Sequence, residues 1–159
     1  MTATLTAGQP APPFALTDGA GNPHRLSDYA GRWLVLYFYP KDDTAGCNRE
    51  ACGFRDAAAR LEALNARVIG VSLDGPESHR RFDAKFRLGF PLLCDTGGAA
   101  ARAYGSYFGV ACIRLARRHT FIIDPEGRIA RVYRRVQPAR HGEQIVADLQ
   151  ALQTGTGGE

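Results

Sequence analysis

Two cysteines, Cys47 and Cys52, are the residues whose type and spacing in this sequence could do chemistry. The chain has 159 residues and four cysteines, far fewer than a small disulfide scaffold carries. In a reducing compartment, paired cysteines more often mean redox chemistry or metal binding than structural disulfides. The two residues are therefore candidates for a redox-active or metal-binding pair.

Cys47 stands where the local structure would activate a thiol. It follows an apolar run at residues 33–39 and a polar loop at residues 41–46, and a helical pattern begins after that loop. In open α/β sheets, binding sites form beyond the carboxyl ends of strands. The helix dipole and the unpaired N–H groups of the first helical turn both favour a thiolate there. We therefore expect Cys47 to be reactive; the alternative is a small buried residue in the first turn of a helix.

The spacing of Cys47 and Cys52 limits what the two thiols can do together. Five residues along one helix separate their Cα atoms by roughly 8–9 Å and turn the side chains about 140° apart. A disulfide needs Cα atoms within about 7 Å, so the pair cannot bond until the first turn or two of the helix unwinds. The thiols are either unrelated or a redox couple that depends on local unfolding. The sequence has no Cys-x-x-Cys motif, which disfavours disulfide reduction of the thioredoxin type.

Hydrophobic patterns predict the elements that would position these thiols. The expected strands cover residues 33–39, 68–73, 92–93, 119–123 and 129–133, after an N-terminal hairpin at residues 14–26. The expected helices cover residues 47–66, 77–87, 99–104 and 142–152, while residues 106–116 stay unassigned. This order predicts an α/β protein with a thioredoxin-like fold: a central mixed β-sheet flanked by helices, with an N-terminal β-hairpin.

Length and hydropathy indicate one domain without a membrane segment. We expect a single domain over residues 1–159, with flexible ends at residues 1–7 and 154–159. No apolar run approaches the roughly 18–20 residues that cross a bilayer. The N-terminus lacks a basic start followed by an apolar stretch, so we expect a cytoplasmic location and no membrane partner.

Two other classes of protein remain as alternatives. The formal net charge is +4, and residues 80–159 carry 13 basic and 7 acidic residues, which could form a nucleic-acid surface. Arginine is, however, the general cation of this chain, at 18 of its 20 basic residues, and we expect no nucleic-acid partner. The four cysteines could ligate zinc, but Cys94 and Cys112 are not paired with further ligands, and we expect no metal.

Pro40, Thr44 and Cys47 form the pattern Pro-x-x-x-Thr-x-x-Cys. This pattern resembles the active-site motif of the peroxiredoxins. The chain is more closely similar to their bacterioferritin comigratory protein subfamily, the Q-type peroxiredoxins. The longer similar stretches are residues 26–31, 37–44, 46–47, 50–56, 90–93, 103–105, 118–124 and 138–141. The resemblance covers most of residues 8–152.

This resemblance implies a thiol-dependent peroxidase that reduces hydrogen peroxide and organic hydroperoxides without a cofactor. Cys47 would be the peroxidatic cysteine and Cys52 the resolving cysteine of an intramolecular disulfide, which thioredoxin or a similar dithiol would reduce. Thr44 and Arg118 would donate hydrogen bonds to the thiolate and the bound peroxide. Pro40 would shield the thiolate from solvent. We expect the domain to act as a monomer or at most a weak dimer.

Several residues depart from the family pattern or lie beside it. Ala45 stands where the family often has proline, which would stiffen the loop before Cys47. We expect Cys94 to be a small buried residue and Cys112 an additional exposed thiol. We hypothesise that Glu50, three residues after Cys47, orients an arginine of the pocket such as Arg118. The alternative is an exposed first-turn glutamate favoured by the helix dipole.

The four histidines do not suggest a catalytic base. We expect His24 and His79 at the surface, and His119 on the strand face opposite Arg118. His141 begins the last predicted helix, where we expect a capping or packing residue.

Overall fold

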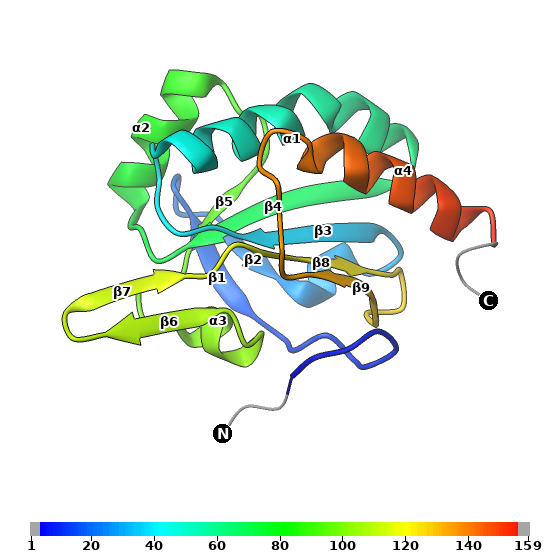
Figure 1. The fold of residues 1–159 in the computed structure, drawn as a ribbon, viewed down its shortest axis with the longest axis horizontal. Coiled ribbons are helices and arrows are strands. Elements are labelled where there is room, and N and C mark those ends of the chain that lie inside the picture. Colours follow the sequence, from blue (N-terminus) through cyan, green and yellow to red (C-terminus); the bar gives the residue numbers. More distant parts are fainter. Residues whose placement is uncertain (1–3, 156–159) are drawn as a thin grey trace.

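The computed structural model describes residues 4–155, and its centre is a seven-stranded mixed sheet (Figure 1). The strands lie in the order β2-β1-β5-β4-β3-β8-β9. Their bounds are β1 (Ala15–Asp18), β2 (Pro23–Arg25), β3 (Trp33–Phe38), β4 (Ala66–Ser72), β5 (Leu92–Cys94), β8 (His119–Ile123) and β9 (Ile129–Tyr133). The pairs β3–β4 and β4–β5 are parallel, and the other pairs are antiparallel. The predicted mixed sheet with its N-terminal hairpin, β1–β2, is confirmed.

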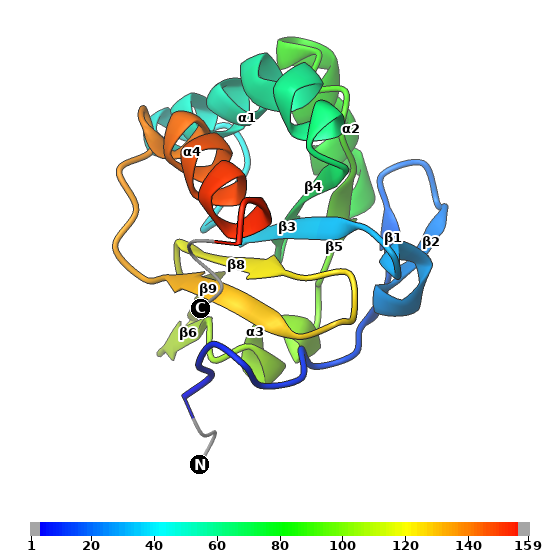
Figure 2. The same cartoon turned by 90° about the vertical axis from the view of Figure 1, so that its right-hand side faces the viewer.

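Helices cover both faces of this sheet. They are η1 (Leu26–Tyr29, a 3₁₀ helix), α1 (Ala45–Ala63), α2 (Pro76–Phe86), α3 (Ala99–Ala103) and α4 (His141–Gln153). The helices α1, α2 and α4 lie together on one face, whereas α3 lies on the other (Figure 2). The chain is therefore an α/β sandwich, as the order of predicted elements indicated.

The position of β3 inside the sheet, between β4 and β8, explains why its sequence is an unbroken apolar run. Val35 and Tyr37 point into a core cluster that includes Phe54 of α1. Their neighbours Leu36 and Phe38 point into a second cluster on the opposite face. Because successive side chains alternate between two covered faces, every position of the strand must be apolar. This burial fixes the strand whose carboxyl end precedes Cys47.

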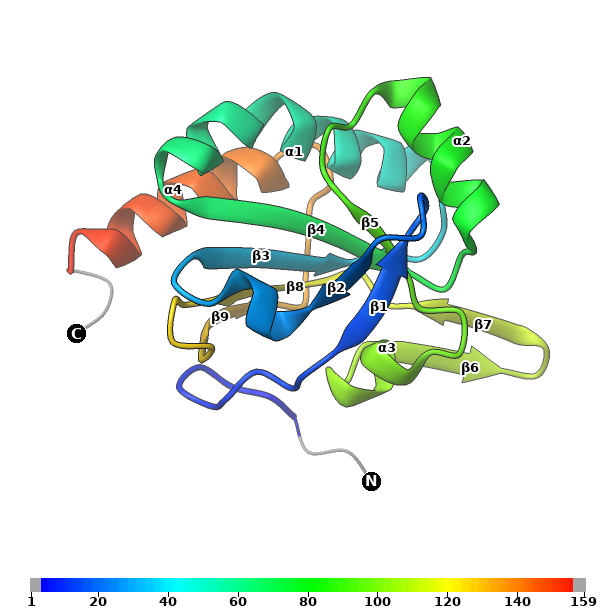
Figure 3. The same ribbon diagram turned by 180° about the vertical axis from the view of Figure 1, so that it is seen from behind.

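Residues 106–116, unassigned from the sequence, contain a two-stranded hairpin. Its strands are β6 (Tyr107–Val110) and β7 (Ile113–Ala116), and it extends away from the central sheet (Figure 3). At its tip Ala111 adopts a φ of 55°, in the left-handed region that glycine or asparagine usually occupies. The sequence offers no such turn residue there, so the hairpin signal was missing.

The prediction that His79 lies at the surface was wrong. His79 is 1% exposed and lies on the same buried side of α2 as Phe82. Its ring nitrogens lie 2.7 Å from Asp42 Oδ2 and 2.9 Å from the carbonyl oxygen of Leu93. Polar partners inside the fold make this burial possible, and the sequence pattern gives no sign of them. His24 is half-buried rather than fully exposed.

The ends of the chain bear on two further expectations. The flexible ends predicted at residues 1–7 and 154–159 fall partly outside the described residues. Within the described part, Leu5 packs against the core, and the Gly8 N–H donates to the Ile129 carbonyl at 2.7 Å. Of the helices in residues 4–155, none is long and apolar enough to cross a membrane.

Candidate active site

Cys47 lies in the first turn of α1, directly beyond the carboxyl end of β3. The residue is 1% exposed. The first hydrogen bond of the helix runs from the Asn48 N–H to the Thr44 carbonyl at 2.8 Å. The amides of Ala45, Gly46 and Cys47 precede that bond and lie at the open, positive end of the helix. The thiol thus occupies the strand-to-helix position that the sequence predicted.

Arg118 bridges the thiol to a buried carboxylate. Its Nη2 atom donates to Cys47 Sγ at 3.4 Å, and its Nη1 atom donates to Glu50 Oε1 at 2.7 Å. The approach is close: a Cβ atom on Gly46 would lie 3.0 Å from Arg118 Nη2. Glycine at position 46 therefore lets the guanidinium reach the sulfur. The expected placement of Arg118 beside Cys47 is present.

Glu50 is fully buried, so the alternative of an exposed first-turn glutamate was wrong. Burial raises the pKa of the Glu50 carboxyl to about 7, although the charge and hydrogen bond of Arg118 oppose that rise. Among the described residues Glu50 Oε2 has no hydrogen-bond partner, and neither does the buried hydroxyl of Tyr37. A carboxylate with one unsatisfied oxygen in an apolar setting carries a cost of desolvation, and this cost is what raises the pKa.

Thr44 is the N-cap residue of α1, and Pro40 lies in the segment between β3 and α1. The Thr44 hydroxyl donates to the Lys41 carbonyl at 3.1 Å, within the loop before α1. No hydrogen bond between Thr44 and Cys47 occurs among the described residues, so the expected contact is not made in this state. Pro40 lines a hollow of about 520 Å³ together with Arg118. The same hollow is bordered by Phe108, Leu115, Arg117, Arg134, Arg135 and Val136.

Cys52 lies on α1 with Cys47, as the helical pattern predicted. Both thiols are free, Cys47 being buried and Cys52 half-buried. Two residues five positions apart on one regular helix are too distant to form a disulfide. The structure therefore describes the reduced state, in which the first turns of α1 are wound.

Comparisons with known proteins give the family of the chain. The sequence model of the AhpC/TSA family matches residues 7–132 of the chain. The chain belongs to the AhpC/TSA family. Within it, peroxiredoxin Bcp of Bacillus subtilis (strain 168) is 40% identical over 154 residues, which is 94% of this chain and 98% of that protein. Chloroplastic peroxiredoxin Q of Sedum lineare is 38% identical over 154 residues, covering 94% of this chain and 81% of that protein.

Solved structures give the same assignment. Peroxidoxin BcpB of Mycobacterium tuberculosis superposes with a TM-score of 0.87 at 32% identity, over 93% of this chain and 98% of that chain. The bacterioferritin comigratory protein of Xanthomonas campestris gives a TM-score of 0.85 at 32% identity, over 92% and 99% of the two chains. The study of the latter concerns its alkyl peroxide reduction activity. The resemblance to Q-type peroxiredoxins is confirmed, and the chain is a thiol peroxidase of that type.

The other two cysteines of this peroxiredoxin lie outside the site. Cys94 ends β5 and is half-buried rather than fully buried. Burial, and next the charge of Asp42, raise the pKa of its thiol to about 11, which keeps it protonated. Cys112 is exposed at the tip of the β6–β7 hairpin, as expected. Neither thiol has the environment of a ready nucleophile beside Cys47.

The histidines of this peroxiredoxin serve the structure. His119 is buried and hydrogen-bonds Ser106 at 2.9 Å. It lines the same hollow as Arg118, so its predicted place on the face opposite Arg118 stays a prediction. Burial, and then the charges of Arg134 and Arg117, lower the pKa of His119 to about 4, so its ring is neutral at pH 7. His141 opens α4 and hydrogen-bonds Thr120 at 2.8 Å, which confirms its predicted packing role.

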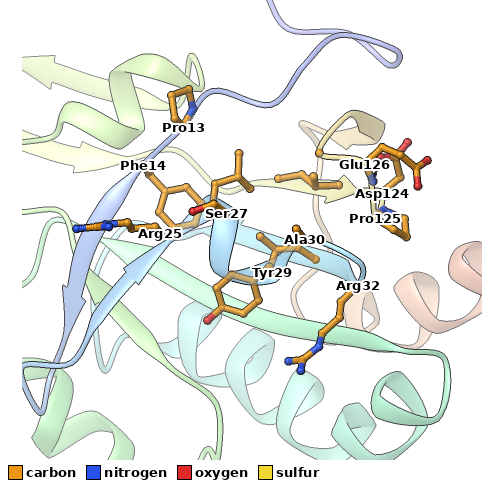
Figure 4. A pocket seen from close by; sticks show the side chains of 14 residues that line it. Pro13, Phe14, Arg25, Ser27, Tyr29, Ala30, Arg32, Asp124, Pro125 and Glu126 are labelled. Atoms are coloured by element: carbon orange, nitrogen blue, oxygen red, sulfur yellow. Dashed lines mark hydrogen bonds between the residues drawn. The ribbon is translucent and has the colours of Figure 1, made fainter.

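Two further features help to locate the chemistry. Within residues 4–155, no group of three or more metal-ligating side chains comes together, and the comparisons support neither the zinc-binding nor the nucleic-acid-binding alternative. A separate hollow of about 450 Å³ lies near the start of β3 and is lined by Phe14, Tyr29 and Pro125 (Figure 4). Cysteine and histidine are both missing from its lining. This hollow lies at the other end of β3 from Cys47 and Arg118.

Proposed function

We propose that this thiol peroxidase works through Cys47 as the peroxidatic cysteine and Cys52 as the resolving cysteine. The observation that carries the proposal is the guanidinium of Arg118, which donates to Cys47 Sγ and to buried Glu50 at the same time. A charged donor held in place at the sulfur is suited to meet negative charge without reorganising. Hydrogen peroxide and organic hydroperoxides are the proposed substrates.

In the first step the Cys47 thiolate attacks one peroxide oxygen. A sulfur–oxygen bond forms, the oxygen–oxygen bond breaks, and the departing oxygen leaves with its electron pair and takes up a proton. Arg118 and the open amides at the start of α1 supply hydrogen bonds to the charge that develops. Glu50 acts as a positioning residue, since its carboxylate holds the guanidinium in register. Cys47 is left as a sulfenic acid, and the peroxide becomes water or an alcohol.

Thr44 and Pro40 complete the proposed pocket. When peroxide binds, the Thr44 hydroxyl would turn from the Lys41 carbonyl toward the substrate, a rotation about one side-chain bond. The ring of Pro40 would keep bulk water from the thiolate at the edge of the hollow that it shares with Arg118. Both roles rest on the family resemblance, with support from the place of Thr44 at the start of α1 and of Pro40 in the hollow beside Arg118.

In the second step Cys52 resolves the sulfenic acid. Its sulfur attacks Cys47 Sγ, a disulfide forms, and the oxygen leaves as water. This step requires the first turns of α1 to unwind, because the helix keeps the two Cα atoms apart. An external dithiol of thioredoxin type then reduces the disulfide and is itself oxidised. We propose that one cytoplasmic chain carries out the whole cycle as a single domain and a monomer.

A thiol count by mass spectrometry, before and after one equivalent of hydrogen peroxide, tests the proposal. Wild type should gain a Cys47–Cys52 disulfide, whereas Cys52→Ser should accumulate sulfenic or overoxidised Cys47. Cys94→Ser is the matched control and should behave as wild type. A disulfide from Cys47 to Cys94 or Cys112 would overturn the assignment of Cys52. A Glu50→Gln variant with an unchanged rate of Cys47 oxidation would remove the role of Glu50.

A further inference from the structure

A buried cluster beneath the active-site loop is not used by the chemistry above. Its centre is Asp42, in the loop that connects β3 to α1, five residues before Cys47. The Asp42 carboxylate accepts hydrogen bonds from the Tyr39 hydroxyl at 2.6 Å, the Ser78 hydroxyl at 2.8 Å and His79 Nδ1 at 2.7 Å. A carboxylate with three donors in the protein interior is fixed in position.

His79 extends this cluster from the loop to the sheet. Its Nε2 atom lies 2.9 Å from the carbonyl oxygen of Leu93 on β5, and a carbonyl oxygen can only accept. Since the Asp42 carboxylate faces the other ring nitrogen, both ring nitrogens lie against acceptors, an arrangement that favours the imidazolium. Burial by itself would lower the pKa of His79, but Asp42, the Leu93 carbonyl and the charge of nearby Asp74 together raise it. The ion pair between the side chains of His79 and Asp42 is 1% and 3% exposed, respectively.

Two further contacts attach this loop, one to the segment after β4 and one to α2. The Asp42 N–H donates to Asp74 Oδ2 at 2.9 Å, just beyond the end of β4. The next residue, Asp43, adopts a φ of 57° and pairs with Lys85 of α2 at 2.9 Å. The Asp43–Lys85 pair is 45% and 57% exposed, so solvent screens it and it holds the loop weakly. The buried imidazolium–carboxylate pair is thus the firm attachment.

We propose that His79 is a positioning residue which, through Asp42, anchors the start of the active-site loop to α2 and β5. This inference rests on the proposed pairing of Cys47 with Cys52. With Asp42 fixed, the unwinding that brings the two sulfurs together is confined to residues 44–51. The anchor keeps Cys47 in register with Arg118 for the attack on peroxide, and it opposes the motion that forms the disulfide. His79 therefore sets the balance between oxidation of Cys47 and its resolution.

The balance is measurable as the competition between disulfide formation and overoxidation. A sulfenic acid that waits for Cys52 can react with a second peroxide and become a sulfinic acid. In His79→Gln the side-chain amide can satisfy only one of the two acceptors, so the loop should loosen. We expect the first oxidation of Cys47 to slow. We also expect the peroxide concentration that gives half overoxidation to rise about tenfold, in line with the loss of one charge-assisted hydrogen bond.

Controls separate positioning from loss of stability. Ile129→Ala removes a buried side chain on the other face of the sheet, so it should lower the melting temperature and leave the half-overoxidation concentration as in wild type. Unchanged partitioning in folded His79→Gln would overturn the inference. If His79→Gln does not fold, Ser78→Ala is the deciding variant, because it removes another donor to Asp42. A smaller rise in the half-overoxidation concentration supports the anchor, and an unchanged concentration overturns it. Wild type that forms no Cys47–Cys52 disulfide would instead overturn the proposed function.

Discussion

In the proposed mechanism, the guanidinium group of Arg118 is the central hydrogen-bond donor. Arg118 reaches Cys47 with one nitrogen and Glu50 with another, so the geometry of its planar fork matters as much as its charge. Glu50 is 68 residues away in sequence, is fully buried and retains one unpartnered oxygen. Arg118 and Glu50 therefore form an ion pair that carries a cost of desolvation. The protonation of Glu50 depends on whether Arg118 stays beside it.

The variant Arg118→Lys tests whether the site needs the two fixed donor directions of the guanidinium group. An ammonium group keeps the positive charge but cannot hold the sulfur and the carboxylate in two fixed directions. We expect kcat/KM for hydrogen peroxide to fall about 10²–10³-fold, the usual loss on removing a fixed transition-state donor. Stopped-flow oxidation kinetics measure this, with the exposed Arg81→Lys on α2 as the matched control. Oxidation of Arg118→Lys at a rate close to that of wild type would contradict the two-directional role.

Glu50→Gln tests the electrostatics of the buried carboxyl. Burial raises the pKa of Glu50 from 4.5 to about 7 in the folded protein, so the folded state holds the proton more tightly than the unfolded chain. The stabilisation is complete below pH 4.5 and is lost as the pH rises toward about 7. Relative to Glu50→Gln, the free energy of unfolding of wild type should therefore fall between these pH values. Urea unfolding at about pH 5 and about pH 8, on either side of the raised pKa, measures it, and parallel pH dependence in the two proteins would refute the shift.

At the scale of elements, α1 must be rigid enough to hold Cys47 and soft enough to release it. Its N-cap Thr44 makes no side-chain capping bond, so the first turn lacks a common source of stability. Further along, α1 crosses α4 at close range, because a Cβ atom on Gly142 would lie 2.7 Å from the Gly53 carbonyl oxygen. The start of the helix is free to unwind while its middle is held against α4.

Ala45→Pro should stiffen the start of α1. Thr44 has φ −112° and ψ 156°, which suits a residue before proline, and proline is favoured at the first helical position. We expect the free energy of unfolding of the reduced protein to rise by about 0.4–1 kcal/mol. Because the wound state is stabilised, disulfide formation should slow and overoxidation should begin at lower peroxide. Mass spectrometry across a peroxide titration measures this, and faster resolution would contradict it.

Gly142→Ala tests the close crossing of α1 and α4. The added methyl group would meet the backbone of Gly53, which cannot turn aside as a side chain could. We expect a loss of about 1–3 kcal/mol in the free energy of unfolding, from overpacking. Gly97→Ala is the control. A Cβ atom there would meet no other atom within 4 Å, and Gly97, unlike Gly155, does not have a positive φ, so its stability should change little. Equal stability of both variants would show that the crossing can relax.

At the scale of the whole molecule, the sheet is a fixed platform, and we propose that the change on oxidation is local. The strands β3, β4 and β8 are covered by apolar clusters on both faces, so they have no room to follow the motion of the loop. The buried pair of Asp42 and His79 ties the loop to this platform. In the proposed cycle, one end of α1 unwinds and rewinds on a rigid core at each turnover.

Hydrogen exchange should map that motion directly. We expect the amides of residues 48–52 to be protected in the reduced protein and to lose protection when the disulfide forms, since their helical hydrogen bonds must open. The amides of β3 and β4 should exchange alike in both states. Cys52→Ser treated with peroxide is the control and should keep its protection. Loss of protection across the sheet would contradict a local change.

The sequence by itself determined the apolar strand, the loop and the helix that place Cys47, because each has a local pattern. It also determined the spacing of Cys47 and Cys52 and, through motif similarity, the partnership of Cys47 with Arg118. Only the tertiary structure decided that Glu50 is the buried partner of Arg118 and that His79 lies beneath the active-site loop. Those contacts join residues 68 and 37 positions apart, and their strength depends on exclusion of water, which no local pattern encodes.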